Sequence, residues 1–438
     1  MYVGRTRTPH KYAPNCASLD TCERMKSSAF VLLLSMHVAC SFFFSGSFSS
    51  SSSSGSSSRN RVRMLVDVAK HPLELSFSEL SELIGGSGKA RMVWNSLKRG
   101  EDPLDGSTSD LSDRARMYFQ TILEKRQQRL IPVTIEQSTV SPCGTRKFLG
   151  GLEDGAKIES VLIPAGKFDR TTLCVSTQIG CDRGCVFCAT GKMGIQRNLT
   201  ASEIIGQVYL GLQLAIEHDM PPMTNIVFMG MGDAGRNTDS VGQAVNCLAD
   251  VDRFCFARSK VTVSSVGPSP EVFQTLADMP CTLAWSLHAA DDGLRRKLVP
   301  STRHTTIELR EGLLNALKTR ESLKQRTIMI AVTLIDGVND RVEDAQDLAN
   351  FVRPMLEVAP KIALDLIPYN DIGVAGIGRP SRERVNEFQA HLRRQGFFCS
   401  VRVTRGDEED SACGQLTTKS MKISREIIEH GEVQVQSA

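Results

Sequence analysis

Residues 171–404 contain a series of short apolar runs, many of them rich in β-branched side chains. The runs cover 172–178, 225–232, 260–267, 282–288, 327–335, 362–370 and 399–404. Segments with a helical spacing of apolar positions separate most of the runs. They cover 200–218, 270–279, 306–320, 341–356 and 381–396. Strands that alternate with helices are typical of parallel βαβ units, so the pattern predicts an α/β fold with a partial (β/α)6 barrel.

The residues before this region show two other patterns. Residues 65–130 contain helical spacing at 77–85, 88–100 and 111–126, which predicts a small N-terminal helical accessory domain. Residues 131–170 contain three extended runs separated by Gly-containing turns, which predict a small β extension. The expected organisation is listed along the chain as follows: targeting segment 1–64, helical domain 65–130, β extension 131–170, barrel 171–404 and C-terminal segment 405–438.

The first 64 residues have the composition of a targeting segment. Residues 25–44 combine one Lys, an apolar stretch and small residues, as a signal peptide does, and residues 45–63 are rich in Ser and contain Arg but no acid. The apolar stretch is short for a membrane span and is interrupted by His37. Such a segment cannot bury a core and is expected to be disordered. The two-part pattern resembles the targeting sequences of plastid proteins in algae with secondary plastids. We expect an organelle, with a plastid favoured over a mitochondrion or the cytoplasm, and Met25 is a second candidate start.

Composition narrows the class of protein only slightly. The chain is 41% hydrophobic and 23% charged, which is ordinary for a soluble globular protein. The net charge is +3, which does not by itself indicate a nucleic-acid binder. Thirteen cysteines in 438 residues do not resemble the disulfide framework of a small secreted domain. A reducing compartment, in which thiols remain available for chemistry, fits this cysteine usage better.

Three of the thiols are grouped in a loop that follows the first predicted strand. Cys181, Cys185 and Cys188 have the spacing C-x3-C-x2-C. A structural zinc site usually requires four ligands, commonly in paired C-x2-C units, and no fourth ligand lies in this loop. Iron–sulfur clusters are held by thiolates, and three protein ligands on a four-iron cluster leave one iron open.

The spacing, with Phe187 before the last cysteine, resembles that of radical S-adenosylmethionine enzymes. In that superfamily the open iron chelates the methionine moiety of S-adenosylmethionine, which is then split to give a 5′-deoxyadenosyl radical. The flanking motifs narrow the resemblance to the RlmN/Cfr family of radical S-adenosylmethionine RNA adenine methyltransferases. They are CVSTQIGCDRGCVFCATGKMGIQRNLTASEIIGQV, NIVFMGMGD, VTVSSVG, SLHAADDGLRRKLVP, DGVND and TRGDEEDSACGQL, in order between about 75 and 420. The resemblance implies a radical-SAM type of barrel, a [4Fe-4S] cluster and two S-adenosylmethionine molecules per turnover.

Three residues acquire catalytic roles from this resemblance. Cys413 is implied to be methylated by one S-adenosylmethionine and then to lose a hydrogen to the radical. Cys174 is implied to help remove the proton from carbon 2 of adenine and to form a transient disulfide with Cys413, which releases the product. Glu159 matches a family glutamate assigned to proton transfer. From the residues alone, either cysteine is equally a buried small hydrophobe, and Glu159 a solvated charge before a strand.

A second group of residues matches the family's S-adenosylmethionine pocket. Its members are Gly232, Asp233, Ser264, Ser286, Leu287, His288 and Asn370, all at or near the ends of predicted strands. Individually, the serines would be strand-end hydroxyls and His288 a core histidine. The family pattern G-E-P reads Gly232-Asp233-Ala234 in this chain, so the acid is one methylene shorter and a proline is missing.

The resemblance also implies partners. Family substrates are an adenosine in the peptidyl-transferase region of large-subunit rRNA and, often, an anticodon-loop adenosine of tRNA. Basic stretches at 96–100, 124–129 and 294–300 are candidate phosphate contacts, although a charge run of this kind, taken on its own, is more often a solvated face. We further expect an electron donor such as ferredoxin or flavodoxin, no membrane association and a monomer.

Three alternatives stay open from the sequence. The first is methylation of carbon 8 of adenine, as in the Cfr branch. The second is a catalytically impaired RNA-binding homologue, which the altered Gly232-Asp233-Ala234 turn favours. The third is a zinc-stabilised structural protein.

Overall fold

The computed structural model describes residues 70–105, 111–165, 168–402 and 412–417. The predicted targeting segment at 1–64 and most of the predicted C-terminal segment at 405–438 lie outside these ranges. Within them, no helix combines the length and the apolar character needed to cross a membrane.

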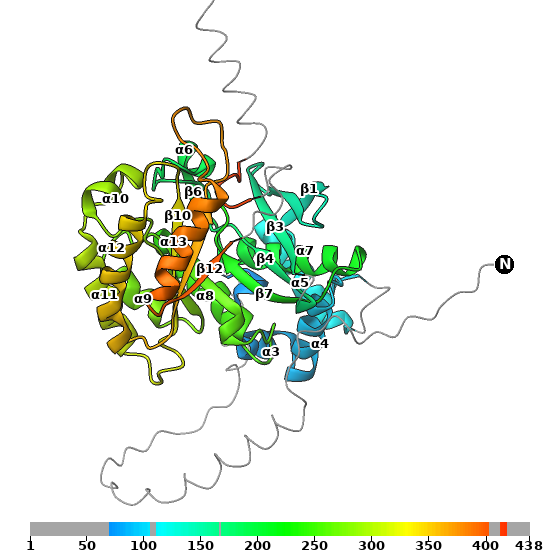
Figure 1. The fold of residues 1–438 in the computed structure, drawn as a ribbon. Helices are drawn as coiled ribbons and strands as arrows, with labels where there is room; N and C mark the ends of the chain where they lie inside the picture. Colours follow the sequence, from blue (N-terminus) through cyan, green and yellow to red (C-terminus); the bar gives the residue numbers. More distant parts are fainter. Residues whose placement is uncertain (1–69, 106–110, 166–167, 403–411, 418–438) are drawn as a thin grey trace, which may run out of the picture.

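A ten-stranded sheet forms the centre of the molecule, in the order β1-β2-β3-β4-β7-β8-β9-β10-β11-β12. Seven of its strands are parallel: β4 (Arg170–Cys174), β7 (Met223–Phe228), β8 (Val261–Ser265), β9 (Thr282–Ser286), β10 (Ile328–Leu334), β11 (Ile362–Pro368) and β12 (Phe398–Val401). Each strand overlaps one of the seven predicted apolar runs, and β4, β7 and β12 begin one or two residues before theirs. Helices cover one face of these strands, and the other face points into the barrel interior. Because both faces are buried, the strands are apolar without a strict alternation of polar and apolar residues. In the described residues β1 and β12 are the edges of the sheet, so the barrel is open (Figure 1).

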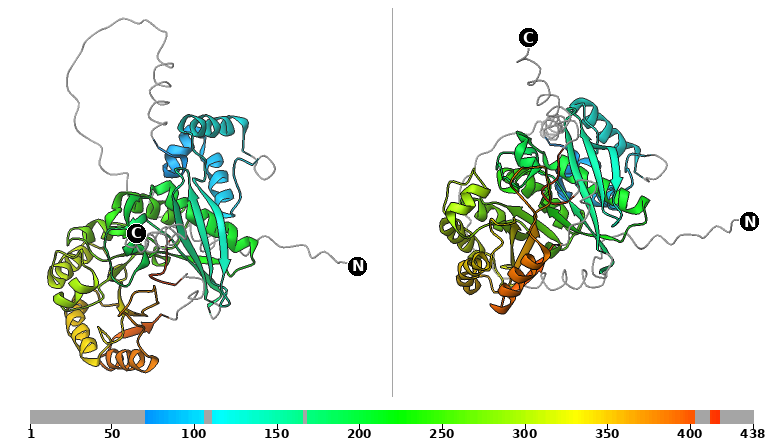
Figure 2. Two further views of the ribbon diagram at one scale, coloured as in Figure 1. Left: turned by 90° about the horizontal axis from the view of Figure 1, so that it is seen from above. Right: turned by 45° about the horizontal axis from the view of Figure 1, so that its top comes forward.

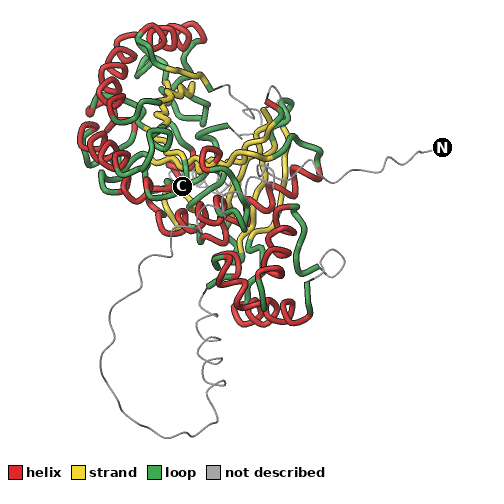
Figure 3. The backbone as a smooth tube through the Cα atoms, turned by 90° about the horizontal axis from the view of Figure 1, so that it is seen from below, coloured by secondary structure: helices red, strands yellow, loops and turns green. Residues whose placement is uncertain are grey.

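Helices lie on the outer side of the parallel strands (Figure 3). They are α7 (Ala201–Glu217), α8 (Thr238–Ala249), α9 (Val272–Ala277), α10 (Asp292–Leu298), α11 (Thr306–Lys318), α12 (Val342–Val352) and α13 (Arg382–Arg394). Short 3-10 helices are η3 (Ala234–Arg236), η4 (Arg258–Lys260) and η5 (Arg353–Glu357). Pairing each of the first six parallel strands with the helix that follows gives six βα units, which confirms the predicted partial (β/α)6 barrel. Helix α8 was not predicted, although Val241, Ala244, Val245 and Leu248 are buried at helical spacing.

The three strands expected in 131–170 are present but do not form a separate sheet. They are β1 (Val133–Val140), β2 (Arg146–Leu152) and β3 (Lys157–Ala165). These strands pair antiparallel with one another, and β3 pairs antiparallel with β4 through Val161 and Cys174. They therefore continue the barrel sheet beyond its first parallel strand.

The N-terminal helices pack against the barrel. They are η1 (Pro72–Glu74), α3 (Phe77–Ile84), α4 (Ser87–Lys98) and α5 (Asp113–Arg126). Figure 2 shows them, in blue to cyan, at the opposite end of the molecule from α12 and α13. Trp94 of α4 is fully buried, and its ring meets that of Phe254, which follows α8, with centroids 5.6 Å apart. The helices and the barrel thus share one continuous apolar core.

Helix α7 also binds the backbone where the chain leaves β4. Gln207 on this helix is fully buried; its Oε1 accepts from the Ser176 amide and the Ser160 hydroxyl, both at 2.8 Å. Its Nε2 donates to the Ser176 carbonyl at 3.0 Å. Buried peptide groups need partners, so this one side chain fixes the path of the chain toward the cysteine loop.

Replacing Gln207 with Leu should destabilise the fold strongly. The substitution leaves both peptide groups of Ser176 without this partner, and each unsatisfied buried group costs about 1–3 kcal/mol. We expect the free energy of unfolding to fall by about 2–4 kcal/mol, seen as a lower urea midpoint with an unchanged slope. Gln213→Leu, at an exposed position of the same helix, is the control and should change stability by less than about 0.5 kcal/mol. Equal midpoints for the two variants would contradict this role of Gln207.

Candidate active site

A cavity opens at the carboxyl ends of the parallel strands, where β/α barrels carry their active sites. The predicted site residues that line it are Cys181, Cys185, Cys188, Gly232, Asp233, Ser264, Ser286, His288, Asn370 and Cys413. They come from strand ends and loops that are far apart in the sequence. The fold therefore brings the cysteine loop, the predicted S-adenosylmethionine pocket and the C-terminal thiol to one place.

The other three predicted residues are not among the described residues that line this cavity. The side chain of Leu287 is fully buried in the apolar core, while its amide donates to the carbonyl of Ala331 at 3.0 Å. Cys174 is the last residue of β4 and is buried. Glu159 lies on β3 with 3% of its surface exposed.

The cysteine loop is built on a two-stranded hairpin of β5 (Gln178–Cys181) and β6 (Gly194–Asn198). Cys181 ends β5, and Cys188 is the N-cap of the one-turn helix α6 (Ala189–Lys192). Gly180 has φ +76°, and a Cβ there would lie 1.8 Å from the Gly194 carbonyl oxygen, so only glycine allows this hairpin.

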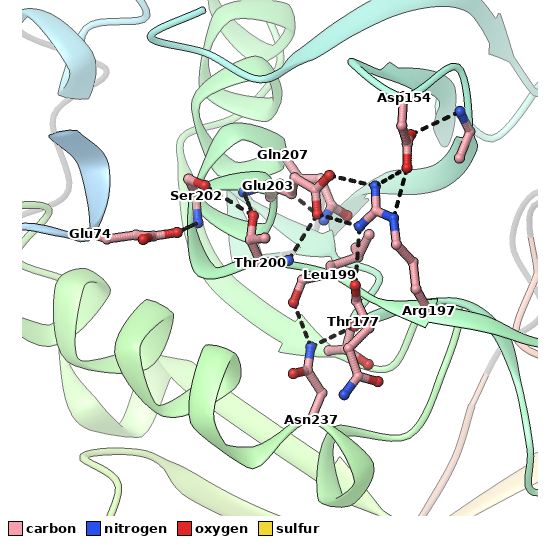
Figure 4. A network of polar contacts seen from close by, with 12 residues as sticks. Glu74, Asp154, Thr177, Arg197, Leu199, Thr200, Ser202, Glu203, Gln207 and Asn237 are labelled. Carbon is pink, nitrogen blue, oxygen red and sulfur yellow. Dashed lines mark hydrogen bonds and ion pairs between the residues drawn. The ribbon is translucent and has the colours of Figure 1, made fainter. Parts of the chain in front are cut away.

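Polar contacts attach this hairpin to helix α7 (Figure 4). Arg197 of β6 donates to both carboxylate oxygens of Glu203 at 2.8 and 2.9 Å, and to Asp154 Oδ2 at 2.8 Å. Glu203 simultaneously caps the start of α7 by accepting from the Thr200 amide at 2.8 Å. The loop that carries the thiols is therefore tied to the start of the barrel's first helix.

The three thiols are buried near one another, so their thiolate forms would place several negative charges together away from water. Burial raises the pKa of Cys181 to about 12 and raises the pKa of Cys185 and Cys188 as well, and neighbouring thiolates add to each shift. Three thiolates can coexist here only beside a positively charged group such as a metal centre. Within the described ranges, no group of three His, Cys, Asp or Glu side chains is placed to hold a single metal ion. All three thiols line one cavity, and thiolates are the ligands that hold iron–sulfur clusters.

Asp233 supplies a buried carboxylate to the same cavity. Its Oδ1 accepts from the amides of Gly235 and Val266 at 3.4 and 3.3 Å, and Oδ2 has no partner. Burial raises the pKa of this carboxyl group. An unpaired carboxylate oxygen inside a cavity needs a donor, and the ammonium group of S-adenosylmethionine is one. The shorter acid in the Gly232-Asp233-Ala234 turn thus retains a free oxygen for this contact.

The remaining strand-end residues are ordered by local contacts. The hydroxyls of Ser264 and Ser286 lie 3.1 Å apart on adjacent strands. His288 has φ +67°, its ring lies 4.6 Å from that of Phe187, and its Nδ1 accepts from the Thr333 amide. Burial lowers the pKa of His288 to about 3, so the ring is neutral.

The C-terminal residues 412–417 run alongside the cysteine loop. The Ala189 amide donates to the Gly414 carbonyl at 2.7 Å, and the Thr190 hydroxyl donates to the Leu416 carbonyl at 2.6 Å. Asn370 Nδ2 donates to the Cys413 carbonyl at 2.9 Å. The Cys413 side chain is thereby presented to the cavity.

Cys174 and Cys413 are close enough to influence each other electrostatically. The pKa of Cys174 is raised to about 12, mainly by burial and then by the negative charge of a Cys413 thiolate, while the guanidinium of Arg402 acts in the opposite direction. Arg402, at the end of β12, also lines the cavity and pairs with Asp365. Both cysteines are free thiols in the structure, so the transient disulfide stays a prediction.

Sequence reasoning missed several residues of this site. Arg402 and Arg183 line the cavity, and Thr190 lines it while binding the C-terminal segment. Arg183 was visible inside the cysteine motif, but no spacing rule assigns it a contact. Gln207 is one of two glutamines in an otherwise apolar helical stretch, so the sequence alone did not distinguish it from the exposed Gln213.

The site also corrects one interpretation of the basic stretches. Arg295, within 294–300, is fully buried and donates to the Leu287 carbonyl, so it stabilises the fold and is not available to phosphates. Arg296 and Lys297 beside it are exposed.

Comparison with known proteins identifies the class. No protein-family model matches the chain. The crystal structure of a radical SAM methyltransferase from Sphaerobacter thermophilus superposes with a TM-score of 0.68 at 35% identity, covering 78% of this chain and 98% of that one. Fold and site together place the protein among the radical S-adenosylmethionine methyltransferases.

Sequence relatives narrow the class to a family. The dual-specificity RNA methyltransferase RlmN of Marinobacter nauticus is 35% identical over 356 residues, 80% of this chain and 92% of the relative. The enzyme of the same name from Marinomonas sp. is 37% identical over 325 residues, 73% of this chain and 84% of the relative. The chain belongs to the RlmN family.

Loss of the Arg197 contacts should loosen the cysteine loop. Arg197→Met removes hydrogen bonds to two carboxylates, and we expect stability to fall by about 1–2 kcal/mol. Iron content after anaerobic reconstitution should fall with it. Arg197→Lys should recover only part of the loss because an ammonium cannot make the two-pronged contact to Glu203. Arg303→Met, at an exposed position, is the control; iron loading of Arg197→Met equal to this control would refute the role of Arg197.

Asp233 should determine affinity for S-adenosylmethionine. Asp233→Asn removes the negative charge that faces the ligand's ammonium group, and we expect about tenfold weaker binding. Asp233→Glu keeps the charge and should retain most of the affinity. Calorimetric titration of the cluster-loaded protein under anaerobic conditions measures both. Wild-type affinity in Asp233→Asn would exclude this contact.

Proposed function

We propose that this protein methylates carbon 2 of adenosine in RNA, in large-subunit rRNA and in the anticodon loop of tRNA. The proposal rests on one observation above all: Cys413, from the C-terminal segment, lines the same cavity as Cys181, Cys185 and Cys188. The names of the relatives, dual-specificity RNA methyltransferases, support RNA as the substrate class.

Carbon 2 of adenine explains why two extra thiols are needed. The carbon is electron-poor and offers no lone pair to an ordinary methyl donor, whereas a carbon radical on a protein thioether can add to it. The adduct must then be cleaved from the protein, and a second thiol within disulfide reach can do this. Cys413 and Cys174 fit these two roles.

The cofactor assignment follows from the donor set. Cys181, Cys185 and Cys188 would hold a [4Fe-4S] cluster, and Asp233 with the strand-end serines would hold S-adenosylmethionine, two molecules of which are used per turnover. The bound cluster and S-adenosylmethionine would supply the methyl group and the radical. The chain's own residues hold the ligand, exclude water and aim the two thiols.

The substrate base has to leave its stack to reach the cavity. Candidate phosphate contacts are exposed basic residues in two places. Arg296 and Lys297 lie beside the site, and Lys125 on α5, with Arg99 and Arg129 just after α4 and α5, lie at the N-terminal helices. We further propose an electron donor of the ferredoxin or flavodoxin type, a monomeric enzyme, and plastid import directed by residues 1–64.

Nucleoside analysis tests the proposal directly. Anaerobically reconstituted protein is incubated with S-adenosylmethionine, a reductant and either rRNA or tRNA, and the digested RNA is analysed by mass spectrometry. We expect 2-methyladenosine from the wild type, and none from Cys413→Ala. Cys143→Ala, which removes an exposed thiol of the β1–β2 turn, is the matched control and should keep the activity.

Other outcomes identify the rival functions. Formation of 8-methyladenosine without the 2-methyl isomer would assign the Cfr-type reaction. Absence of 5′-deoxyadenosine from a fully iron-loaded protein would indicate an RNA-binding homologue. Zinc in place of iron and sulfide would indicate a structural site.

A further inference from the structure

Glu159 is bound on both sides of its carboxylate. Oε1 lies 3.1 Å from Lys147 Nζ, and Oε2 accepts from the Thr417 amide at 2.8 Å. The Glu159 and Lys147 side chains are 3% and 7% exposed. A buried carboxylate that accepts from two donors, one of them charged, is held firmly in place.

The strand register puts this ion pair beside Cys174. Lys147 of β2 pairs with Val161 of β3, which pairs with Cys174 of β4. Directly opposed residues point to the same face of a sheet, so these three side chains form one row. Glu159 lies two positions before Val161 and therefore shares that face. Its own carbonyl accepts from the hydroxyl of Ser176 at 2.7 Å, just beyond Cys174.

Thr417 is the far end of the turn that carries Cys413. The Ala412 amide donates to Gln415 Oε1 at 3.0 Å, and the Gln415 amide donates back to the Ala412 carbonyl at 3.1 Å, which closes the turn. Among the described residues, the turn also makes polar contacts with the cysteine loop and with Asn370 and Asp371 just after β11. Glu159 provides the contact to the strands that present Cys174.

We propose that Glu159, paired with Lys147, is a positioning residue that fixes the Cys413 turn through the Thr417 amide and so sets the approach of Cys413 to Cys174. The inference deepens the proposed function and rests on it for its catalytic meaning. It gives Glu159 a different task from the proton transfer that the family resemblance implies. Its carboxylate is already bound by Lys147 and by the Thr417 amide, and Glu159 is not among the described residues that line the cavity.

The disulfide equilibrium of the two thiols measures their approach without any RNA. Cluster-loaded protein, free of S-adenosylmethionine, is equilibrated anaerobically with glutathione and glutathione disulfide. One glutathione disulfide oxidises the Cys174–Cys413 pair and leaves two glutathiones, and the linked peptide is quantified by mass spectrometry. The result is the effective concentration of one thiol at the other.

Removing either partner of the hydrogen bond between Glu159 and the Thr417 amide should lower this effective concentration. Glu159→Ala removes the acceptor, and Thr417→Pro removes the donor without touching Glu159. We expect about a tenfold fall in each, as for loss of one hydrogen bond to a charged group. Thr417→Ala keeps the amide and is the matched control, expected within about twofold of the wild type. Iron content reports whether each variant has folded.

A double variant separates positioning from proton transfer. In Glu159→Gln with Lys147→Met, the amide oxygen can still accept from the Thr417 amide, no charge is left unpaired, and no strong proton acceptor remains. If Glu159 acts by positioning, the double variant should restore the effective concentration. Its RNA methylation should then be about tenfold higher than that of Glu159→Ala.

Two results would overturn the inference. One is an unchanged effective concentration in both Glu159→Ala and Thr417→Pro. The other is a double variant that restores the effective concentration but not methylation, because Glu159 would then act as a proton acceptor. If the wild type makes no methylated nucleoside, the proposed function fails, while the disulfide equilibrium still decides whether Glu159 anchors the Cys413 turn.

Discussion

Buried peptide groups after β4 impose the constraint on which the site depends. The chain leaves the sheet at Ser176 and crosses the interior before it reaches the cysteine loop, so its amides and carbonyls need partners away from water. Gln207 binds both peptide groups of Ser176, and Asn237 Nδ2 donates to the carbonyls of Thr177 and Leu199 at 2.8 Å (Figure 4). Two amide side chains thus determine where the thiols of the loop can lie.

The parallel strands were predictable because strands buried on both faces leave continuous apolar runs in the sequence. The cysteine loop was predictable because its spacing is local. Contacts between distant positions leave no such trace: Thr417 and Glu159 are 258 residues apart, and only the folded chain shows that they meet. For the same reason the sequence could not tell that the Leu287 side chain faces the core.

The altered turn at Gly232-Asp233-Ala234 shows how a departure from a family pattern can be absorbed. Asp233 accepts from two backbone amides through one oxygen, which stabilises the turn in the absence of a proline ring. The other oxygen stays available inside the cavity. A shorter acid therefore keeps the structural contacts of the turn and leaves one oxygen that is available for the predicted contact with S-adenosylmethionine.

The contact between Trp94 and Phe254 has a consequence for the evolution of such enzymes. The two aromatic rings belong to different segments but bury each other. Substitutions in the N-terminal helices and substitutions in the barrel are therefore not independent of each other. Grafting the leading helices of a distant homologue onto this barrel would expose one ring to solvent unless the partner surface were exchanged with it. New RNA specificities are thus more easily reached by changing solvent-facing side chains than by exchanging modules.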